Sequence, residues 1–245
     1  MELDLLAAPW LLVLVLVIVF VAAIVQAGLG MGFGLMAAPL LAVLDPELVP
    51  APALFLGFAS SLLVALQQHR HIHWPEVGIA SVGRLAGVAA SSAVLLFFTD
   101  RNSFSILFAL MIGLAVLLSA FGPRVAFTRP RLFGVAIISG LMGTITSVGA
   151  PPLALIYQNR PAQSARATLA AFFTIGCAMS LGALYLTGWA SSRDFRLALL
   201  MAPAMIAGLL AGRLLQSRFD RRYRGLMLIA SGLAAVLLLG RGILG

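Results

Sequence analysis

The segment Gly28-Leu-Gly-Met-Gly-Phe-Gly34 interrupts an apolar run that begins at Pro9, and Pro39 follows it closely. A second interruption, Gly140-Leu-Met-Gly-Thr-Ile-Thr-Ser-Val-Gly-Ala-Pro-Pro152, lies in the other half of the chain. Glycine and proline at these densities favour unwound backbone over continuous helix. Corresponding interruptions in the two halves of a hydrophobic chain are typical of transporters whose binding site lies between internal repeats.

Composition assigns the chain to a class before any motif does. Hydrophobic residues make up 62% of it and charged residues only 10%, well outside the range of soluble domains. A helix of roughly 20 apolar residues crosses the hydrocarbon core of a bilayer. Segments of this kind cover residues 9–27, 52–67, 77–98, 104–120, 167–187, 197–215 and 226–239. With the broken segments at 28–44 and 132–157, they predict an all-α polytopic membrane protein with 8–10 transmembrane segments.

The connections between these segments are short, so residues 1–245 are expected to form a single membrane transport domain. Glu2 and Asp4 stand where a secretory signal would carry positive charge, and the first span is therefore expected to stay in the mature chain. The net charge of +8 comes from arginines scattered over the loops, a distribution that does not predict a nucleic-acid partner.

Neither a metal nor a cofactor is expected. Cys177 is the single cysteine and lies in an apolar span, which excludes an intrachain disulfide and a cysteine metal cluster. His69, His71 and His73 alternate with other residues near a helix end, where their side chains would point in different directions. We interpret them as part of a loop or a segment facing lipid headgroups.

The arginines predict the topology. If each broken segment returns the chain to the side from which it came, eleven arginines share one face and four the other, with Arg84 inside a span. Single crossings would divide the same residues seven against eight, which leaves the positive-inside rule unsatisfied. The predicted cytoplasmic group is Arg70, Arg124, Arg129, Arg131, Arg160, Arg166, Arg213, Arg218, Arg221, Arg222 and Arg224. The opposite group is Arg101, Arg193, Arg196 and Arg241.

This topology gives each half an odd number of elements, so the second half is inserted upside down relative to the first. The sequence therefore predicts two inverted repeats, the first at about residues 9–121 and the second at about 127–244. Each contains a Gly/Pro-broken re-entrant or discontinuous helix plus full spans. The step in numbering from Gly30 to Gly143, which we call the repeat offset, also aligns Pro39 with Pro152, Ser61 with Thr174 and Glu47 with Arg160.

The two breaks are the predicted binding site. Unwound backbone at membrane depth needs a cavity or protein to satisfy it, and the N-termini of half-helices attract anions. No catalytic residue is expected. The predicted substrate-binding residues are Gln26, Gly30, Gly32, Gly34, Ser60, Ser61, Arg84, Gly143, Thr144, Thr146, Ser147, Gly149, Arg166 and Thr174, and Thr168 is a further hydroxyl candidate. Helix packing by small residues is the alternative interpretation of the glycines.

The two arginines in this set each have two interpretations. Arg84 lies inside the third span, where a charge is costly unless it is paired or faces a cavity. It either attracts the anion or snorkels to the cytoplasmic headgroups. Arg166 opens the helix after the second break, where it either attracts an anion toward the inner vestibule or braces the loop at Gln158 and Asn159.

Both halves resemble one known family. The first half carries QAGLGMGFGLMAAPLL from Gln26, and the second carries SGLMGTITSVGAPPLALIYQN from Ser139, followed by SARATLAAFF from Ser164. These stretches resemble the TauE/SafE family of sulfite and organosulfonate exporters. The resemblance covers essentially the whole chain. The resemblance implies secondary transport of small sulfur-containing or carboxylic anions by eight or more helices without a cofactor. Met31 and Phe33 depart from the family's runs of consecutive glycine, which bears on substrate identity more than on mechanism.

No aspartate or glutamate falls within the predicted spans, so the carboxylate relay of proton-driven pumps is not expected. An anion that leaves a cell with a negative interior gains about 2.3 kcal/mol per charge per 100 mV. The sequence therefore favours a secondary transporter in the inner (plasma) membrane that exports sulfite, a sulfonate or a related oxyanion by alternating access.

Two other transport functions stay open: an anion uptake symporter, and an anion channel of the same architecture. An enzyme is not expected, because the predicted spans offer serine and threonine without a histidine or carboxylate to act beside them. The expected partners are the lipid bilayer and a small anionic substrate, and the chain is compatible with a homo-oligomer.

Overall fold

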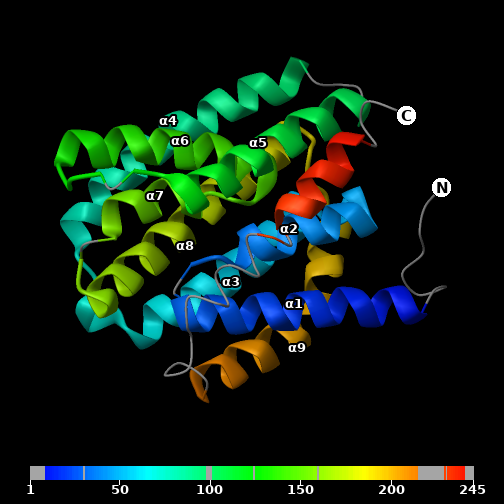
Figure 1. The fold of residues 1–245 in the computed structure, drawn as a ribbon, viewed down its shortest axis with the longest axis horizontal. Coiled ribbons are helices and arrows are strands. Elements are labelled where there is room, and N and C mark those ends of the chain that lie inside the picture. The colour runs from blue at the N-terminus through cyan, green and yellow to red at the C-terminus, as the bar shows by residue number, and fades with distance from the viewer. Residues whose placement is uncertain are drawn as a thin grey trace.

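The computed structural model describes residues 9–29, 31–97, 101–123, 125–158, 160–214, 229 and 231–240, and this part of the chain folds into helices (Figure 1). The elements are α1 Pro9–Leu29, α2 Phe33–Leu44, η1 Pro46–Leu48, α3 Ala51–Gln67, η2 His69–His71, α4 Trp74–Phe97, α5 Arg101–Phe121, α6 Arg129–Thr146, α7 Ala150–Tyr157, α8 Ala162–Leu186 and α9 Ser192–Leu214. A further short apolar helix covers Ser231–Gly240. The predicted all-α class is confirmed.

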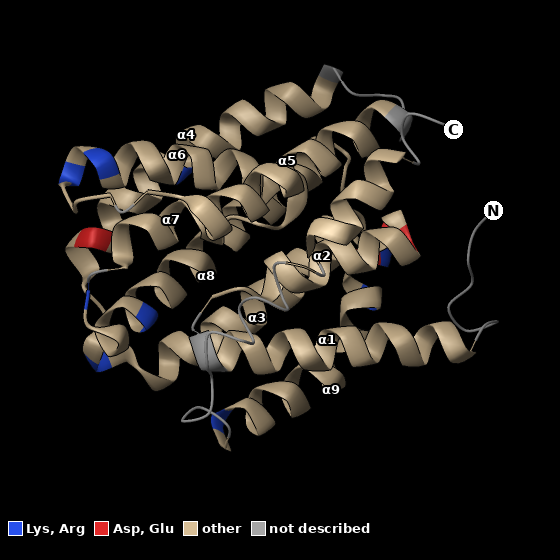
Figure 2. Cartoon of the chain, viewed as in Figure 1, with Lys and Arg blue, Asp and Glu red and all other residues tan. Residues whose placement is uncertain are grey.

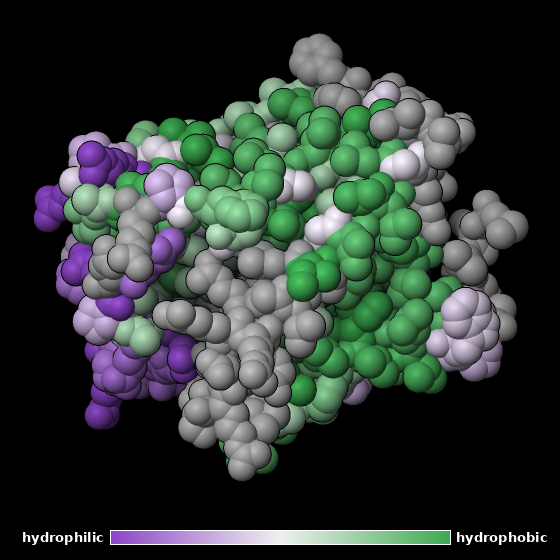
Figure 3. Space-filling model, viewed as in Figure 1, coloured by the Kyte–Doolittle hydropathy of each residue, from purple (hydrophilic) through white to green (hydrophobic). Residues whose placement is uncertain are grey.

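Six helical segments of the described chain are long and apolar enough to cross a membrane, and they correspond to the first six predicted spans. Their outer surfaces are strongly apolar: Trp10, Leu66 and Leu110 are all more than half exposed. Figure 3 shows hydrophobic residues over most of the visible face and hydrophilic residues gathered at one end. Hydrocarbon solvates such a surface, whereas water does not. The chain is a multi-pass membrane protein.

The two predicted interruptions separate pairs of helices. Gly32, between α1 and α2, has φ 113°, and Ser147, between α6 and α7, has φ 63°. Both values lie in the left-handed region, which lets the chain change direction sharply. The second break is shorter than the glycine-rich stretch suggested, because Gly140 and Gly143 lie inside α6.

The helices α6 and α7 form a hairpin whose outer ends lie together. The Val125 N–H donates to the Leu155 carbonyl at 3.3 Å, and the rings of Phe127 and Tyr157 pack edge to face with centroids 5.8 Å apart. The loop before α6 therefore contacts the end of α7, as predicted for a segment that enters the membrane and returns. The membrane face on which this end lies stays a prediction.

Two close helix crossings join the halves of the chain. Each places two glycines, four residues apart on one helix, against the backbone of a helix from the other half, a common device in membrane helices. The contacts join Gly83 and Gly87 of α4 to Phe133 and Ile137 of α6, and Gly208 and Gly212 of α9 to Phe20 and Ile24 of α1. The repeat offset aligns the residues contacted on α1 with those contacted on α6. An inverted repeat would produce this pairing, although the repeat itself stays a prediction.

Charged residues gather at the two ends of the molecule (Figure 2). We call the end where α4, α6 and α8 begin the arginine-rich end. It carries Arg70, Arg129, Arg131, Arg160, Arg166 and Arg213, whereas Arg193 and Arg196 lie at the opposite end. The other arginines of the topology prediction either lie outside the described residues or, as Arg101, have no described side chain.

Candidate functional site

The two breaks contact each other inside the fold. A Cβ atom on Gly34 would overlap the backbone carbonyl of Ser147, so the two backbones pack without side chains between them. The Ser147 hydroxyl also donates to the Pro50 carbonyl at 2.8 Å, which ties the second break to the start of α3. Residues from the two halves therefore meet at one place, as predicted.

A small cavity of about 40 Å³ lies between the breaks. Six of the predicted binding residues line it: Gln26, Gly32, Gly34, Ser61, Ser147 and Gly149. The other lining residues were not predicted from the sequence; they are Met31, Phe33, Leu35, Gly57, Val148, Ala150, Phe173 and Cys177. The volume is roughly what three ordered water molecules need, so the cavity suits a ligand of few atoms.

Two residues of the second break that line this cavity, Gly149 and Ala150, have backbone amides. Pro151 and Pro152 have no N–H, so Gly149 and Ala150 carry the first donors at the start of α7. Neither amide donates a hydrogen bond to another residue in the described part of the chain. Free amides and the positive end of the helix dipole together favour an anion at this point.

The first break contributes in a similar way. Gln26 accepts the Phe33 N–H at 3.1 Å through Oε1, so its side chain caps the start of α2. The next two amides, on Gly34 and Leu35, have no hydrogen-bond acceptor among the described residues. Gln26 therefore orders the break, and its amide nitrogen is the part of the side chain left for a ligand.

Several predicted hydroxyls bond within their own helices. Each donates to a carbonyl three or four residues earlier: Thr144 to Gly140 at 2.8 Å, Thr146 to Met142 at 2.7 Å, Ser60 to Gly57 at 3.1 Å and Thr174 to Ala170 at 2.9 Å. Thr168 instead accepts the His73 N–H at 3.0 Å near the arginine-rich end. None of these five side chains lines the cavity. Of the predicted hydroxyls, the structure brings Ser61 and Ser147 to it.

Arg84 is 1% exposed and lies one layer behind the cavity. Its guanidinium carbon is 5.3 Å from the Phe172 ring centroid and 6.0 Å from that of Phe173, and Phe173 lines the cavity. The interpretation of Arg84 as a snorkelling residue is wrong, because its side chain is enclosed by protein. No described carboxylate forms an ion pair with it.

Two hydroxyl groups hold the Arg84 guanidinium. Nη1 donates to the Ser139 Oγ and Nη2 to the Ser180 Oγ, both at 3.3 Å. Three glycines make room for it: a Cβ atom on Gly143 or Gly149 would lie 3.0 Å from a guanidinium nitrogen, and one on Gly176 would overlap the side chain. Gly143 therefore accommodates Arg84 and does not line the cavity.

A vestibule of about 200 Å³ adjoins the cavity and extends toward the arginine-rich end. Both spaces share Met31, Gly32, Leu35 and Ala150, and the vestibule continues past Ser119, Pro151, Ala154, Tyr157, Gln158 and Ala165. Arg166 follows Ala165 without lining this space, and its buried Nε has no hydrogen-bond partner in the described chain. Its two interpretations stay predictions. Gly30 lies outside the described residues.

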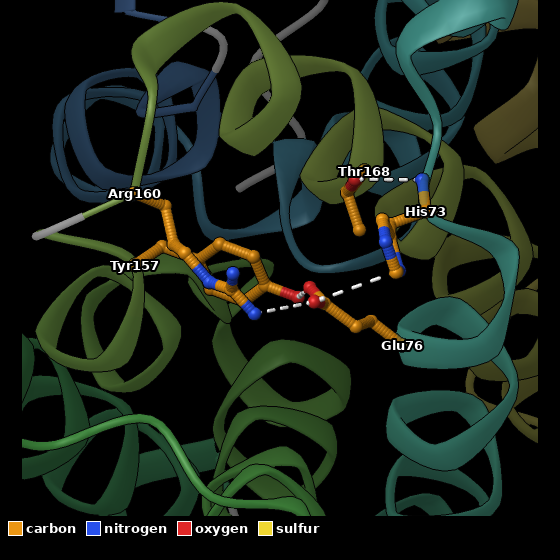
Figure 4. A network of polar contacts seen from close by, with 5 residues as sticks. All are labelled: His73, Glu76, Tyr157, Arg160 and Thr168. Carbon is orange, nitrogen blue, oxygen red and sulfur yellow. Dashed lines mark hydrogen bonds and ion pairs between the residues drawn. The ribbon is translucent and has the colours of Figure 1, made fainter.

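A network of polar contacts lies beside the vestibule and includes Tyr157, which lines it (Figure 4). Glu76 accepts hydrogen bonds from the Tyr157 hydroxyl at 2.8 Å and from Arg160 Nη2 at 2.6 Å, and His73 Nδ1 lies 3.7 Å away. The Arg160 guanidinium also covers the Phe127 ring at 4.1 Å. Burial, then the bond to Glu76, raises the pKa of Tyr157, so the phenol remains a neutral donor.

A second ion pair, in which the acidic and basic residues come from opposite halves of the chain, lies at the other end of the molecule. Arg193 Nη1 lies 2.6 Å from Glu47 Oε2. Glu47 and Arg160, which the repeat offset aligns, thus each pair with a residue at the start of a helix from the other half, α9 and α4 respectively. The charges of the two pairs are exchanged, and each pair joins the two halves.

Sequence patterns would identify some of the missed residues. Ala150 could have been found because the two following prolines leave it one of the few donors at the helix start. Phe173 and Cys177 carry no such signal, since each lies in an apolar stretch of α8 like its neighbours.

The chain is similar to one family of known proteins. No curated protein and no solved structure matches the chain. The family model described as sulfite exporter TauE/SafE matches residues 15–238, which include both breaks and all six long apolar helices in whole or in large part. The chain belongs to the sulfite exporter TauE/SafE family.

Proposed function

We propose that this protein is a secondary transporter that exports a small anion by alternating access across the inner (plasma) membrane. The observation that carries the proposal is the cavity between the breaks, which both halves line. At the starts of α2 and α7 it offers backbone amides that have no acceptor in the described part of the chain. Such amides stabilise negative charge without a neighbouring cationic ligand.

Sulfite or a related oxyanion is the proposed substrate. The family's description names sulfite, and the cavity of about 40 Å³ favours an ion of few atoms over a bulky organic anion. Three oxygen atoms around one sulfur would allow one small ion to accept hydrogen bonds from both breaks at once. Ser61 and Ser147 would add hydroxyl donors from the two halves.

The paired contacts between the halves support alternating access. In the two glycine crossings, α4 packs on α6 and α9 packs on α1. The proposed repeats at 9–121 and 127–244 require this correspondence. One inter-half ion pair lies at each end of the molecule, where a carrier needs contacts that form and separate in turn. The vestibule reaches toward the arginine-rich end, which supports a conformation open on the proposed cytoplasmic side.

Counterflow in proteoliposomes tests the proposal. Vesicles loaded with unlabelled sulfite should take up external radiolabelled sulfite faster than empty vesicles, and the rate should saturate. A channel would give flux that neither saturates at low concentration nor responds to sulfite on the other side. Absence of protein-dependent flux for sulfite, thiosulfate, sulfoacetate and simple carboxylates would contradict an anion-transport function altogether.

A further inference from the structure

We propose that Arg84 is a positioning residue, which acts through Ser139 to point the Ala150 N–H into the anion cavity. The inference rests on the proposed function and deepens it, because it assigns the buried arginine a role other than direct binding of the anion. Two consecutive hydrogen bonds form a chain that connects Arg84 to the second break.

The chain runs from the guanidinium to one peptide group. Arg84 Nη1 donates to the Ser139 Oγ at 3.3 Å, and that hydroxyl donates in turn to the Gly149 carbonyl at 2.6 Å. In a trans peptide the carbonyl and the following N–H point in opposite directions. Because Ser139 draws the Gly149 oxygen to one side, the Ala150 N–H of the same peptide points to the other side. Ala150 lines the cavity.

The Arg84 guanidinium is too enclosed to bind the anion itself in this conformation. Phe173 and Gly149 both line the cavity and both contact the Arg84 side chain, so they stand between the two. Gly176, which lies in α8, packs against the Nε and the adjoining carbon atoms of Arg84. The charge therefore acts on the anion indirectly. It polarises the Ser139 hydroxyl and adds a positive field that the protein interior screens weakly.

A second chain holds the other side of the guanidinium. Nη2 donates to the Ser180 Oγ at 3.3 Å, the Ser180 and Thr144 hydroxyls are 2.8 Å apart, and Thr144 donates to the Gly140 carbonyl in α6. The two chains end on carbonyls before and after the break. Only a planar group with several donors can serve both at once, so lysine cannot replace arginine in this role.

Isotope labelling of one peptide pair tests the orientation directly. Gly-Ala occurs twice in the sequence, at Gly149-Ala150 and at Gly182-Ala183. Protein labelled with carbonyl-¹³C glycine and ¹⁵N alanine therefore gives two amide signals in a carbonyl-filtered NMR spectrum. Gly182 lies in α8 with open space around it and provides an internal control. Added sulfite should move the Ala150 signal and leave the Ala183 signal in place.

Affinity measurements then test the path through Ser139. In Ser139→Ala and in Arg84→Lys, the Kd for sulfite by calorimetry and the KM for transport should both rise about tenfold, as expected for one weakened bond to a charged ligand. The maximal rate should change little. Because both residues act on one peptide, the double variant should lose no more than either single variant. Ser92→Ala, which removes a hydroxyl bonded within α4, should bind like the unaltered protein.

The outcomes separate this inference from the proposed function. Sulfite binding without any movement of the Ala150 signal would overturn the positioning role while leaving the transporter intact. Normal affinity in Ser139→Ala together with a large loss in Arg84→Lys would also overturn it, because the charge would then act without the serine. Absence of sulfite binding to the unaltered protein would instead reject both the proposed substrate and the inference built on it.

Discussion

Gly34 of the first break and Ser147 of the second pack backbone against backbone, and the repeat offset that aligns the two breaks makes these two residues equivalent. In an inverted repeat, a residue that contacts its own equivalent lies on the axis that relates the halves. Under the proposed repeat, this contact therefore marks the axis. The adjoining cavity then lies where both halves bring equivalent backbone atoms together.

We expect Gly34→Ala to abolish transport. The added methyl group would overlap the Ser147 carbonyl, and relieving that overlap should cost about 1–3 kcal/mol and shift one break against the other. Sulfite uptake into proteoliposomes, normalised to inserted protein, measures the effect. Gly113→Ala in α5 is the control, since nothing lies within 4 Å of its added Cβ atom. Full activity of Gly34→Ala would contradict the close contact between the breaks.

Neighbouring serines on α3 should differ in their effect on affinity. Ser61 lines the cavity, so Ser61→Ala should remove one neutral hydrogen bond of about 0.5–1.5 kcal/mol and weaken anion binding roughly three- to tenfold. Ser60 donates to Gly57 within its own helix, and Ser60→Ala should leave affinity unchanged. Calorimetric titration of sulfite into each purified variant provides the comparison. A larger loss in Ser60→Ala than in Ser61→Ala would place the ligand elsewhere.

Single cysteines at Thr128 and Gln163, introduced into a Cys177→Ala background, should share one topology. Both positions are exposed and belong to the arginine-rich end, which the positive-inside rule assigns to the cytoplasm. An impermeant thiol reagent added to intact cells should therefore spare both. A cysteine at Ser192, exposed at the opposite end, should react. Labelling of Thr128→Cys alone would restore a single crossing by the second broken segment.

The two end ion pairs should have opposite effects on access to the vestibule. Glu76→Gln weakens the contact with Arg160 at the arginine-rich end, so a cysteine at Ala154, which lines the vestibule, should react with a soluble thiol reagent about two- to fivefold faster. This range corresponds to a partly exposed pair worth roughly 0.5–1 kcal/mol. Glu47→Gln, at the other end, should slow the same reaction. Equal acceleration by both substitutions would indicate general loosening and no alternation between ends.

The helical class and the places of the breaks could be predicted because they depend on local composition. Apolar runs of spanning length give helices in a bilayer whatever their neighbours, and glycine with proline unwinds them. The exact break was harder: Gly140 and Gly143 continue α6 because Gly87 and Arg84 pack against them, a contact made across the fold. Ser147, which has a side chain, takes the left-handed conformation instead.

The direction of individual side chains could not be predicted. Thr144 and Thr146 lie beside the break in the sequence, yet both hydroxyls satisfy helix carbonyls, as threonine often does inside a helix. For Arg84, the length of the span indicates depth in the membrane and nothing of the surroundings. Its enclosure depends on serines and glycines from α6, the second break and α8 together, and no spacing along the chain reveals that these converge.

The two glycine crossings differ in the residue that follows the first glycine. Arg84 directly follows Gly83 on α4, and the buried Leu209 directly follows Gly208 on α9. If the two halves exchange shapes during transport, the two resulting states are not symmetry equivalents, because a buried cation lies at only one of the two crossings. Their free energies must therefore differ even without substrate or voltage. The empty protein would then rest in one orientation, and its reorientation away from that state would be slower than the reverse step.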